Sequence, residues 1–519
     1  MRARSMGIPR HRYRYLAGRR GAKVICFFAT SVKQAPGARR LLSRVPIGRL
    51  TYLWGMMTSK ELTRRLSELA EEFGVVGASA ALWHDGTLAR AETGTVNVAT
   101  GAPVLPDTLF AAGSITKVFT ASLAMTLVDQ GLLELDAPVQ TYLPDFSLAN
   151  SERSAAISVR MLLNHSSGLP GDYMPDLDPG DDVLERLMRK LTTLQVTGVP
   201  GERWSYSNMG MSTLGRIIEV LTGESYHTAL STRILQPLGL NATADAEELL
   251  LRSIAVGHTV DAATGKTSRV PRLRAWPENG PAGSRLWLDI EALIDFGRMH
   301  IDGTTPDGRR ILSTAALHQM REPQFDDYWG CFPMYVNYGL GWAIVREGAD
   351  PVLSHGGANF GMHSNLYVIP EQKAVLAVLT NSTTGFQLYT ALCESLLKEC
   401  FDVRSPAPSY PPEPSVDIDN DQFVGVYRSP NGEVSVEVHE GRLHLRTTPS
   451  PELVAWERLM GGTSGGSHPL PLVCIDSERR RFSLDLGSPG AYRAVQFYNP
   501  GADGRPTLIR AGTLYERTP

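Results

Sequence analysis

At 519 residues the chain is longer than one ordinary domain, and its 42% hydrophobic and 20% charged residues are a normal globular balance, so we expect two domains and an appendage. The formal net charge of -3, from 51 basic and 54 acidic residues, provides no strong field to attract nucleic acid or an anionic membrane. Five scattered cysteines without a CxxC pair argue against a disulfide framework and against a zinc site. We therefore expect no nucleic-acid partner and no metal.

The first 59 residues are basic and contain no acidic residue, and a short apolar patch, "VICFFATSV", covers Val24 to Val32. No apolar run in the chain reaches the ~20 residues that span a bilayer, so we expect no integral membrane association. The leader fits a twin-arginine or organellar targeting signal, which would place the protein outside the cytoplasm. It also fits a disordered or mis-started extension before a natural start at Met56, which would leave the protein cytoplasmic.

The chain after the leader begins with a helix and a hairpin. Leu62, Leu66, Leu69 and Phe73 recur at helical spacing, which predicts a helix from Glu61 to Phe73. The next twenty residues, 75–94, have strand character on both sides of the turn signal "HDG", and so predict two paired strands. An apolar helix is then predicted over 110–136.

The middle of the chain is helical and its last part returns to strands. Helices are predicted at three places, over 157–170, where Gly168 and Pro170 break the pattern, over 207–223 and over 289–300. Residues 353–382 predict two adjacent strands with a turn at Pro370-Glu371. Strands at both ends and helices between them predict an α+β fold, in which the first and last strands of an antiparallel sheet meet.

A proline- and serine-rich stretch, "RSPAPSYPPEPS" from Arg404, predicts a linker. Short alternating runs follow, such as "GEVSVEVHEGRLHLRT", and predict a small all-β barrel or sandwich. The expected organisation is a leader over 1–59, an α+β domain over 60–403, a linker over 404–416 and an all-β domain over 417–519.

One lysine stands out in the predicted helix over 110–136. Lys117 follows Ser114 by three residues, and a cation in apolar surroundings is costly unless it is paired or loses its proton. A serine at a helix start lies beside free backbone N–H groups, and a desolvated lysine one turn later can accept its proton. The alternative is a serine N-cap with a lysine that reaches solvent. The same pattern recurs at Ser395 to Lys398, in an amphipathic helix where we expect a solvated face.

Two Tyr-x-Asn motifs compete for a second part of the site. Tyr206 and Asn208 lie directly before a predicted helix, at an element boundary where catalytic groups are commonly held. Tyrosine can transfer protons beside a cation, and asparagine can hold both a lysine and a substrate amide. The second motif, Tyr335 to Asn337, lies in an aromatic-rich loop that predicts a pocket wall or a lid.

His-x-Gly occurs at His84, His439 and His355, and only His355 begins a predicted core strand with two glycines after it. Gly356 and Gly357 would let a substrate approach the strand edge, and the N–H of Ala358 could join that of Ser114 in an oxyanion hole. A further motif, "GTSGG" at 462–466, matches a nucleophile elbow, but the prolines after it predict a loop.

In this order, "SITK", "YSN" and "HGG" resemble the serine β-lactamase and penicillin-binding-protein superfamily. The connecting text, including "PDTLFAAGSITKVFTA" and "PGERWSYSNMGMSTLGRIIE", is similar to the class C β-lactamase-like branch with D-aminopeptidase and esterase relatives, from about Leu62 to Leu397. The tail resembles a lipocalin-like domain. The resemblance implies a β-lactamase-like antiparallel sheet flanked by helices, a helical subdomain and an active serine between them.

The resemblance also implies acyl transfer without any cofactor, in which Ser114 attacks a carbonyl and Lys117 and Tyr206 move protons. Asn208 and His355 would position the substrate. His355 replaces the lysine of the Lys-Thr-Gly motif, so the carboxylate of a β-lactam should bind less well. We expect a serine hydrolase for small esters or D-residue-containing peptides. An acyltransferase or peptide cyclase with the same acyl-enzyme and a non-catalytic scaffold are the alternatives, and the oligomeric state stays open.

Overall fold

The computed structural model describes residues 57–518 except 174, 176, 262–263, 272–275, 329–334, 349, 405–417, 460–467 and 486–491. Most of the basic leader, almost all of the predicted linker and the "GTSGG" motif therefore lie outside the described residues. None of the described helices is long and apolar enough to cross a bilayer. The bounds of the four segments expected from the sequence remain predictions.

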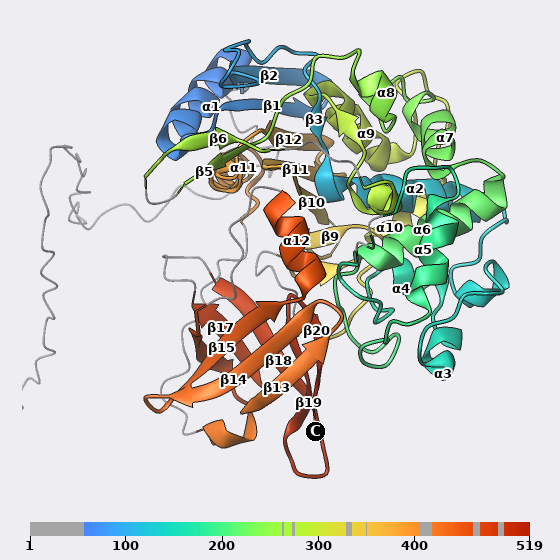
Figure 1. Cartoon of the computed structure of the whole chain (residues 1–519). Helices are drawn as coiled ribbons and strands as arrows, with labels where there is room; N and C mark the ends of the chain where they lie inside the picture. The colour runs from blue at the N-terminus through green and yellow to red at the C-terminus, as the bar shows by residue number, and fades with distance from the viewer. Residues whose placement is uncertain are drawn as a thin grey trace, which may run out of the picture. The chain divides into compact units, whose positions relative to one another are not determined.

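A seven-stranded antiparallel sheet forms the centre of the first domain, in the order β2-β1-β12-β11-β10-β9-β8 (Figure 1). The first strand pairs with the last long one, with Ala78 opposite Thr380, which confirms the expected meeting of the two ends. The predicted hairpin is also confirmed, and Asp85 and Gly86 turn it with φ of 43° and 89°. The strands are β1 Gly77–His84, β2 Thr87–Gly94, β8 Asn337–Tyr338, β9 Ala343–Arg346, β10 Val352–Asn359, β11 Met362–Ile369 and β12 Ala374–Thr380.

The prediction of two strands over 353–382 was wrong, because the structure has three. Strands β10 and β11 are joined by a tight turn in which Phe360 and Gly361 have φ of 50° and 71°. Two residues with positive φ match the right-handed twist of a hairpin. Phe360 is a buried aromatic residue, so its side chain continues the apolar pattern and conceals the turn in the sequence.

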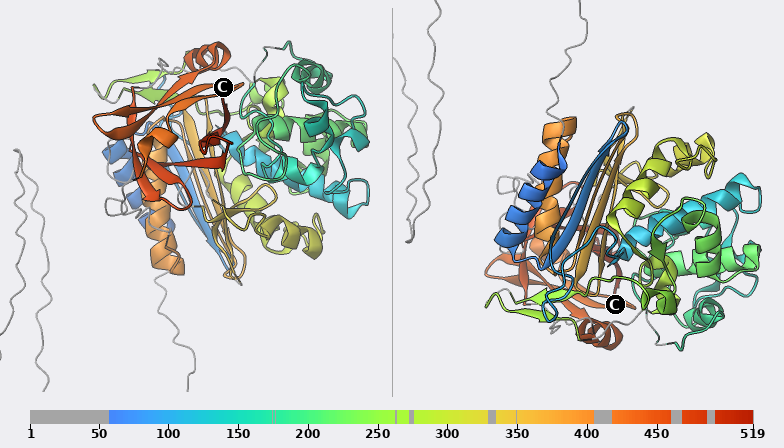
Figure 2. Two further views of the ribbon diagram at one scale, coloured as in Figure 1. Left: turned by 90° about the horizontal axis from the view of Figure 1, so that it is seen from below. Right: turned by 90° about the horizontal axis from the view of Figure 1, so that it is seen from above.

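Helices cover both faces of this sheet (Figure 2). Helices α1 (Ser59–Phe73) and α11 (Gly385–Phe401) pack together on one face, and α9 (Ile290–Asp302) packs on the other face against β1, β11 and β12. The predicted first helix is confirmed, and its buried side is formed by Leu62, Leu66 and Ala70.

The segment predicted as one helix over 110–136 is three elements. Strand β3 (Phe110–Ala111) is followed by the short 3-10 turn η1 (Gly113–Ile115) and by helix α2 (Thr116–Asp129). Gly131, with φ of 70°, follows the end of the helix. Almost every side chain of α2 is buried, which explains why the apolar pattern has no clear polar face. Ser114 therefore lies in the turn that leads into α2.

The helical subdomain packs against α2. Helix α6 runs from Asn208 to Thr222 and is followed by the C-cap Gly223, as predicted. Helix α4 (Val159–Leu163) is shorter than the helix predicted over 157–170. The remaining elements of the domain are α3 Ser151–Ala155, α5 Val183–Leu191, α7 Tyr226–Leu230, α8 Ala246–Leu249, α10 Thr314–Arg321, β4 Ala242–Thr243, β5 His258–Val260, β6 Thr267–Arg269, β7 Trp287–Leu288, η2 Val139–Thr141, η3 Ser231–Leu235 and η4 Pro277–Ala282.

The second domain is a closed eight-stranded barrel, in agreement with the predicted all-β domain. Its first strand pairs with its last, with Tyr427 opposite Arg517, and its interior is filled by residues such as Phe423, Phe482 and Phe497. The elements are η5 Asn420–Gln422, β13 Gly425–Ser429, β14 Gly432–His439, β15 Arg442–Pro449, α12 Pro451–Leu459, β16 Leu470–Asp476, β17 Arg481–Asp485, β18 Tyr492–Pro500, β19 Pro506–Ala511 and β20 Thr513–Arg517.

Candidate active site

Ser114 and Lys117 are in contact at the start of α2. The Nζ atom of Lys117 lies 3.0 Å from Ser114 Oγ and donates a hydrogen bond of 2.5 Å to the carbonyl oxygen of Ala282. Ser114 is half-buried, whereas Lys117 has no exposed surface. The geometry therefore allows Lys117 to exchange a proton with the serine hydroxyl.

Burial lowers the pKa of Lys117 to about 7, and the negative charge of Asp172 opposes this shift. Burial lowers a lysine pKa because the charged form loses its hydration. A substantial fraction of Lys117 is thus uncharged near neutral pH and can act as a base. By contrast, Lys398 of the second Ser-x-x-Lys pattern is exposed on α11, as the sequence predicts.

Tyr206 and Asn208 lie at the start of α6, beside Lys117. The Lys117 Nζ is 4.8 Å from the centre of the Tyr206 ring. The side chain of Ser207 caps the helix by accepting the Gly210 N–H, so the cap fixes the residues on either side of it. Asn208 donates its side-chain amide to the Asp172 carboxylate, and its Oδ1 has no hydrogen-bond partner among the described residues.

The rival Tyr-x-Asn motif has a structural role in the described residues. Asn337, on β8, uses its side-chain amide to hold the carbonyl of Phe325 and the carboxylate of Glu347. Tyr335 and the neighbouring Tyr338 belong to an aromatic cluster that also contains Trp204 and Tyr206. The expectation of a pocket wall or a lid remains a prediction.

His355 lies on β10, and both of its ring nitrogens have partners in the protein. Nδ1 is 2.7 Å from the carbonyl oxygen of Gly356 and therefore donates to it, so Nε2 accepts from the Tyr338 hydroxyl at 3.2 Å. Burial, with a smaller effect of the Lys117 charge, lowers the pKa of His355 to about 3. His355 is thus a neutral histidine that holds Tyr338. Its predicted contact with a substrate requires it to act through Tyr338 or to release one of these bonds.

Strand β10 lies against the turn that carries Ser114. Strand β9 pairs with β10 only as far as Ser354, and η1 packs on the following residues. A Cβ atom on Gly357 would lie 2.1 Å from the carbonyl oxygen of Ala112, and one on Gly113 would lie 2.6 Å from the Ala358 nitrogen. These close approaches require glycine, and they bring the Ala358 N–H next to the Ser114 turn.

Comparison with known proteins identifies the family. The family model described as Beta-lactamase matches residues 62–391. The chain belongs to the Beta-lactamase family. It is 35% identical over 372 residues to penicillin-binding protein 4 of Amycolatopsis lactamdurans, a match that covers 71% of this chain and 97% of that protein. The esterase EstB of Burkholderia gladioli is 32% identical over 181 residues, which cover 32% of this chain and 46% of EstB.

Three solved structures, two of them of SurE, extend the comparison. SurE has a TM-score of 0.71 and 27% identity and covers 89% of this chain and 99% of its own, and its structure with D-Leu aligns similarly. The D-amino acid amidase of Ochrobactrum anthropi SV3, in complex with L-phenylalanine amide, has a TM-score of 0.52 and 25% identity over 64% of this chain and 99% of its own. This chain is therefore a Beta-lactamase-family serine hydrolase with esterase and D-amidase relatives and a C-terminal eight-stranded barrel.

Three residues of the candidate site were not predicted from the sequence: His165, Asp172 and Tyr338. His165 and Asp172 lie in the loop after α4, where the segment "NHSSGLPGD" places polar residues among glycine and proline. Such a loop beside an apolar helix is a weak sign of a site. Tyr338 directly follows the rival Tyr-x-Asn motif, and only the structure shows that its hydroxyl meets His355.

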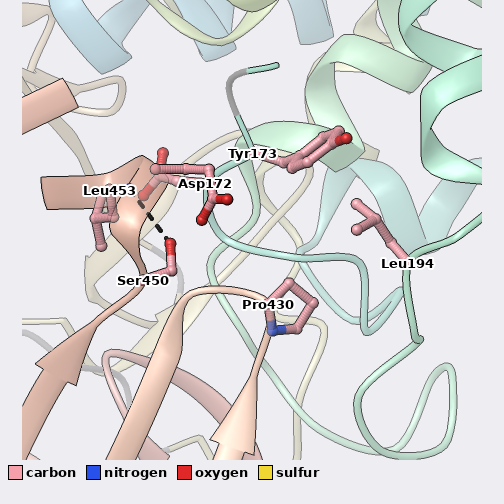
Figure 3. Close-up of a pocket in the computed structure, with 7 residues that line it drawn as sticks. Asp172, Tyr173, Leu194, Pro430, Ser450 and Leu453 are labelled. Carbon is pink, nitrogen blue, oxygen red and sulfur yellow. Dashed lines mark hydrogen bonds between the residues drawn. The ribbon is translucent and has the colours of Figure 1, made fainter. Parts of the chain in front are cut away.

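A cavity of about 160 Å³ lies next to Asn208, because the Asp172 that binds Asn208 also lines the cavity (Figure 3). Its walls come from both domains: Figure 3 labels Asp172, Tyr173 and Leu194 from the first and Pro430, Ser450 and Leu453 from the barrel domain, and Glu452 of the barrel domain also lines it. The cavity combines apolar walls with two carboxylates. Within the described ranges, no group of three or more His, Cys, Asp or Glu side chains is placed to hold a metal ion.

Proposed function

We propose that the chain hydrolyses the amide or ester bond of small substrates that contain a D-configured residue with a free ammonium group, through an acyl-enzyme on Ser114. One observation carries the proposal, namely the 3.0 Å contact between Ser114 Oγ and a fully buried Lys117 whose pKa lies near 7. A serine needs a neighbouring base to become a nucleophile at neutral pH. Lys117 can be that base without the help of a histidine.

The proposed reaction begins with proton transfer from Ser114 Oγ to the neutral amine of Lys117, while Oγ forms a bond to the substrate carbonyl carbon. The N–H groups of Ser114 and Ala358 stabilise the resulting oxyanion. The carbon–nitrogen or carbon–oxygen bond then breaks, and Tyr206 passes the proton from Lys117 to the leaving group. Water attacks the ester in the second half and gives its proton to the same groups, which releases the acid and restores Ser114.

The charges around the site support a substrate with an ammonium group. His355 is neutral and bound at both nitrogens, so it offers no positive charge to a carboxylate. Asp172 places a carboxylate between Asn208 and the cavity. The D-amino acid amidase and SurE with D-Leu are relatives whose names point to D-residues, and EstB points to esters.

The first test is labelling of Ser114 with a fluorophosphonate, followed by mass mapping. We expect one adduct at Ser114, no adduct in Ser114→Ala, and acylation about two orders of magnitude slower in Lys117→Ala, the scale of a lost general base. Ser395→Ala and Lys398→Ala are the matched controls from the second pattern, in which Lys398 is exposed, and should label like the wild type. Equal labelling of Ser114→Ala would refute the nucleophile.

The second test compares substrates. D-amino acid amides and esters should be hydrolysed faster than their L-enantiomers, than their N-acetylated forms and than a chromogenic cephalosporin. Asp172→Asn should raise KM for the ammonium substrates and leave the N-acetylated esters nearly unchanged. A similar loss for both substrate types would show that Asp172 acts only through Asn208.

Transfer of the acyl group to an amine instead of water would make the enzyme an acyltransferase or a peptide cyclase. The cavity supports this second possibility, because a second reactant could enter there and its wall residue Asp172 binds Asn208. Incubation of a D-amino acid ester with and without an amine acceptor separates the two activities. Amide product at the expense of free acid would identify the transferase.

A further inference from the structure

His165 is a fully buried histidine next to the proposed proton-transfer groups, and the proposed mechanism does not use it. It follows α4 and has φ of 62°, in the left-handed region that few residues other than glycine and asparagine adopt readily. A non-glycine residue in this conformation is held there by its surroundings. The surroundings of His165 are the residues next to Tyr206.

Three contacts join His165 to the segment that carries Tyr206. The carbonyl oxygen of His165 accepts the Ser205 N–H at 2.7 Å, and its Nδ1 accepts the Ser207 N–H at 3.2 Å. The His165 ring lies 4.6 Å from the Tyr206 ring, measured between centres. The residues before and after Tyr206 are thus bound to one histidine, whose ring also packs on the tyrosine between them.

This arrangement fixes the tautomer of His165. Because Nδ1 accepts a hydrogen bond, the proton of the neutral ring is on Nε2, which has no partner among the described residues. Burial lowers the pKa of His165 well below its usual value, and the positive charge of protonated Lys117 on α2 acts in the same direction, as would His355 on β10 once it is protonated. Tyr206 and Tyr338 are the other titratable groups that its ring packs against. A protonated ring would place an N–H against the Ser207 N–H and would break the contact.

We propose that His165 is a positioning residue, which holds Tyr206 against Lys117 by accepting the Ser207 N–H and shields both groups from water with its ring. This inference rests on the proposed roles of Lys117 and Tyr206 in proton transfer. It assigns two separable functions to one side chain. The acceptor atom sets the position of Tyr206, and therefore kcat. The ring packs on the same Tyr206 ring that lies 4.8 Å from Lys117 Nζ, so it excludes water from this side of Lys117 and affects the pH at which Lys117 loses its proton.

The test compares His165→Asn with His165→Gly, because both residues tolerate positive φ and only asparagine supplies an acceptor near the position of Nδ1. We expect kcat for a D-amino acid ester to fall about tenfold in His165→Asn and at least one hundredfold in His165→Gly, with KM changed less than threefold. In both variants the acid limb of the kcat/KM profile should move to higher pH by about one unit, since loss of the ring admits water to Lys117.

His300→Asn is the matched control. His300 is also fully buried and uncharged, but it binds Ser122 and Trp342 in the core. This variant should lower the Tm without moving the acid limb. Equal kcat in the two His165 variants, or an acid limb at the wild-type position in both, would overturn the inference.

If His165→Gly does not fold, the acid limb of His165→Asn decides alone. Fluorophosphonate labelling of the wild type distinguishes a failure of the positioning role from a failure of the proposed function. If the wild type labels at Ser114 and the His165 variants keep wild-type kinetics, only the positioning role is refuted. If the wild type gives no adduct at Ser114, the proposed function is refuted.

Discussion

Lys117 owes its chemistry to the apolar helix in which it is buried. The chain around it is closely packed, with the Ala282 carbonyl and Ser114 Oγ as its hydrogen-bond partners, and Asp172 is the charge that favours its protonated form. A buried cation of this kind destabilises the folded protein below its depressed pKa, and the protein retains it because an uncharged amine near pH 7 is a useful base. Loss of that base by protonation should be visible in the kinetics.

We expect kcat/KM for an uncharged ester to fall with pH below about 7, by about tenfold for each pH unit, as Lys117 takes up its proton. The direction follows from the lowered pKa, since the reactive amine is present above it and disappears below it. His355 stays uncharged across this range and should not contribute. The measurement is a pH–rate profile with a neutral ester. A flat profile from pH 5 to 8 would exclude Lys117 as the base.

The sequence was sufficient to predict Ser114 and Lys117 as a pair and to expect Ser395 and Lys398 on a solvated helix face. It did not reveal the contact of Lys117 with the Ala282 carbonyl, because that contact depends on how distant segments pack. His165 and Asp172 were missed for the same reason, because their partners Ser207 and Asn208 lie about 40 residues further along the chain. No local pattern records such a contact between two loops.

Strand β10 and the turn η1 form the part of the candidate site in which two backbone segments pack directly against each other. Ser364, on β11, donates its hydroxyl to the carbonyl of Ala112 at 2.7 Å and so ties the sheet to the residues before Ser114. Gly357 lies between them, in a space that admits no side chain. The sequence predicted this strand and a close approach at its two glycines. The sequence did not reveal the turn at Phe360, because a buried aromatic residue there resembles the interior of a strand.

Gly357→Ala should therefore damage the oxyanion hole. Its Cβ would meet the Ala112 carbonyl oxygen at 2.1 Å and Ser364 Oγ at 2.3 Å, so η1 must move away from β10. We expect acylation of Ser114 to slow by about one hundredfold or more, the scale of one lost oxyanion donor, and the Tm to fall. Gly356→Ala is the steric control, because its Cβ would meet nothing closer than 3.6 Å, and its Tm should be unchanged. Wild-type acylation in Gly357→Ala would show that the hole lies elsewhere.

At the scale of the whole molecule, the barrel contacts the same loops that carry the site. Leu514 donates its backbone N–H to Ser205 Oγ at 3.0 Å, one residue before Tyr206. Glu516 accepts hydrogen bonds of 2.8 Å from Arg153 and from the Gly198 N–H. The sequence predicted a separate β domain beyond a linker, but it contained no sign that this domain contacts the residue before Tyr206. Contacts of this kind suggest that the barrel shapes the substrate site.

Asn431, in the turn between β13 and β14, offers the sharpest test of this role. Its Oδ1 accepts the Gly171 N–H and its Nδ2 donates to the Asp172 carbonyl, each at 3.1 Å, so the barrel fixes the backbone that presents Asp172 to Asn208. Asn431→Ala removes two such bonds at about 1 kcal/mol each, which corresponds to a loss of roughly tenfold or more in kcat/KM for ammonium substrates. Asn420→Ala is the control, because among the described residues the Asn420 side chain donates only to the Gly441 carbonyl within the barrel, and the activity of this variant should be that of the wild type. Unchanged kinetics in Asn431→Ala, with the fold intact by circular dichroism, would show that the barrel docks beside the site without shaping it.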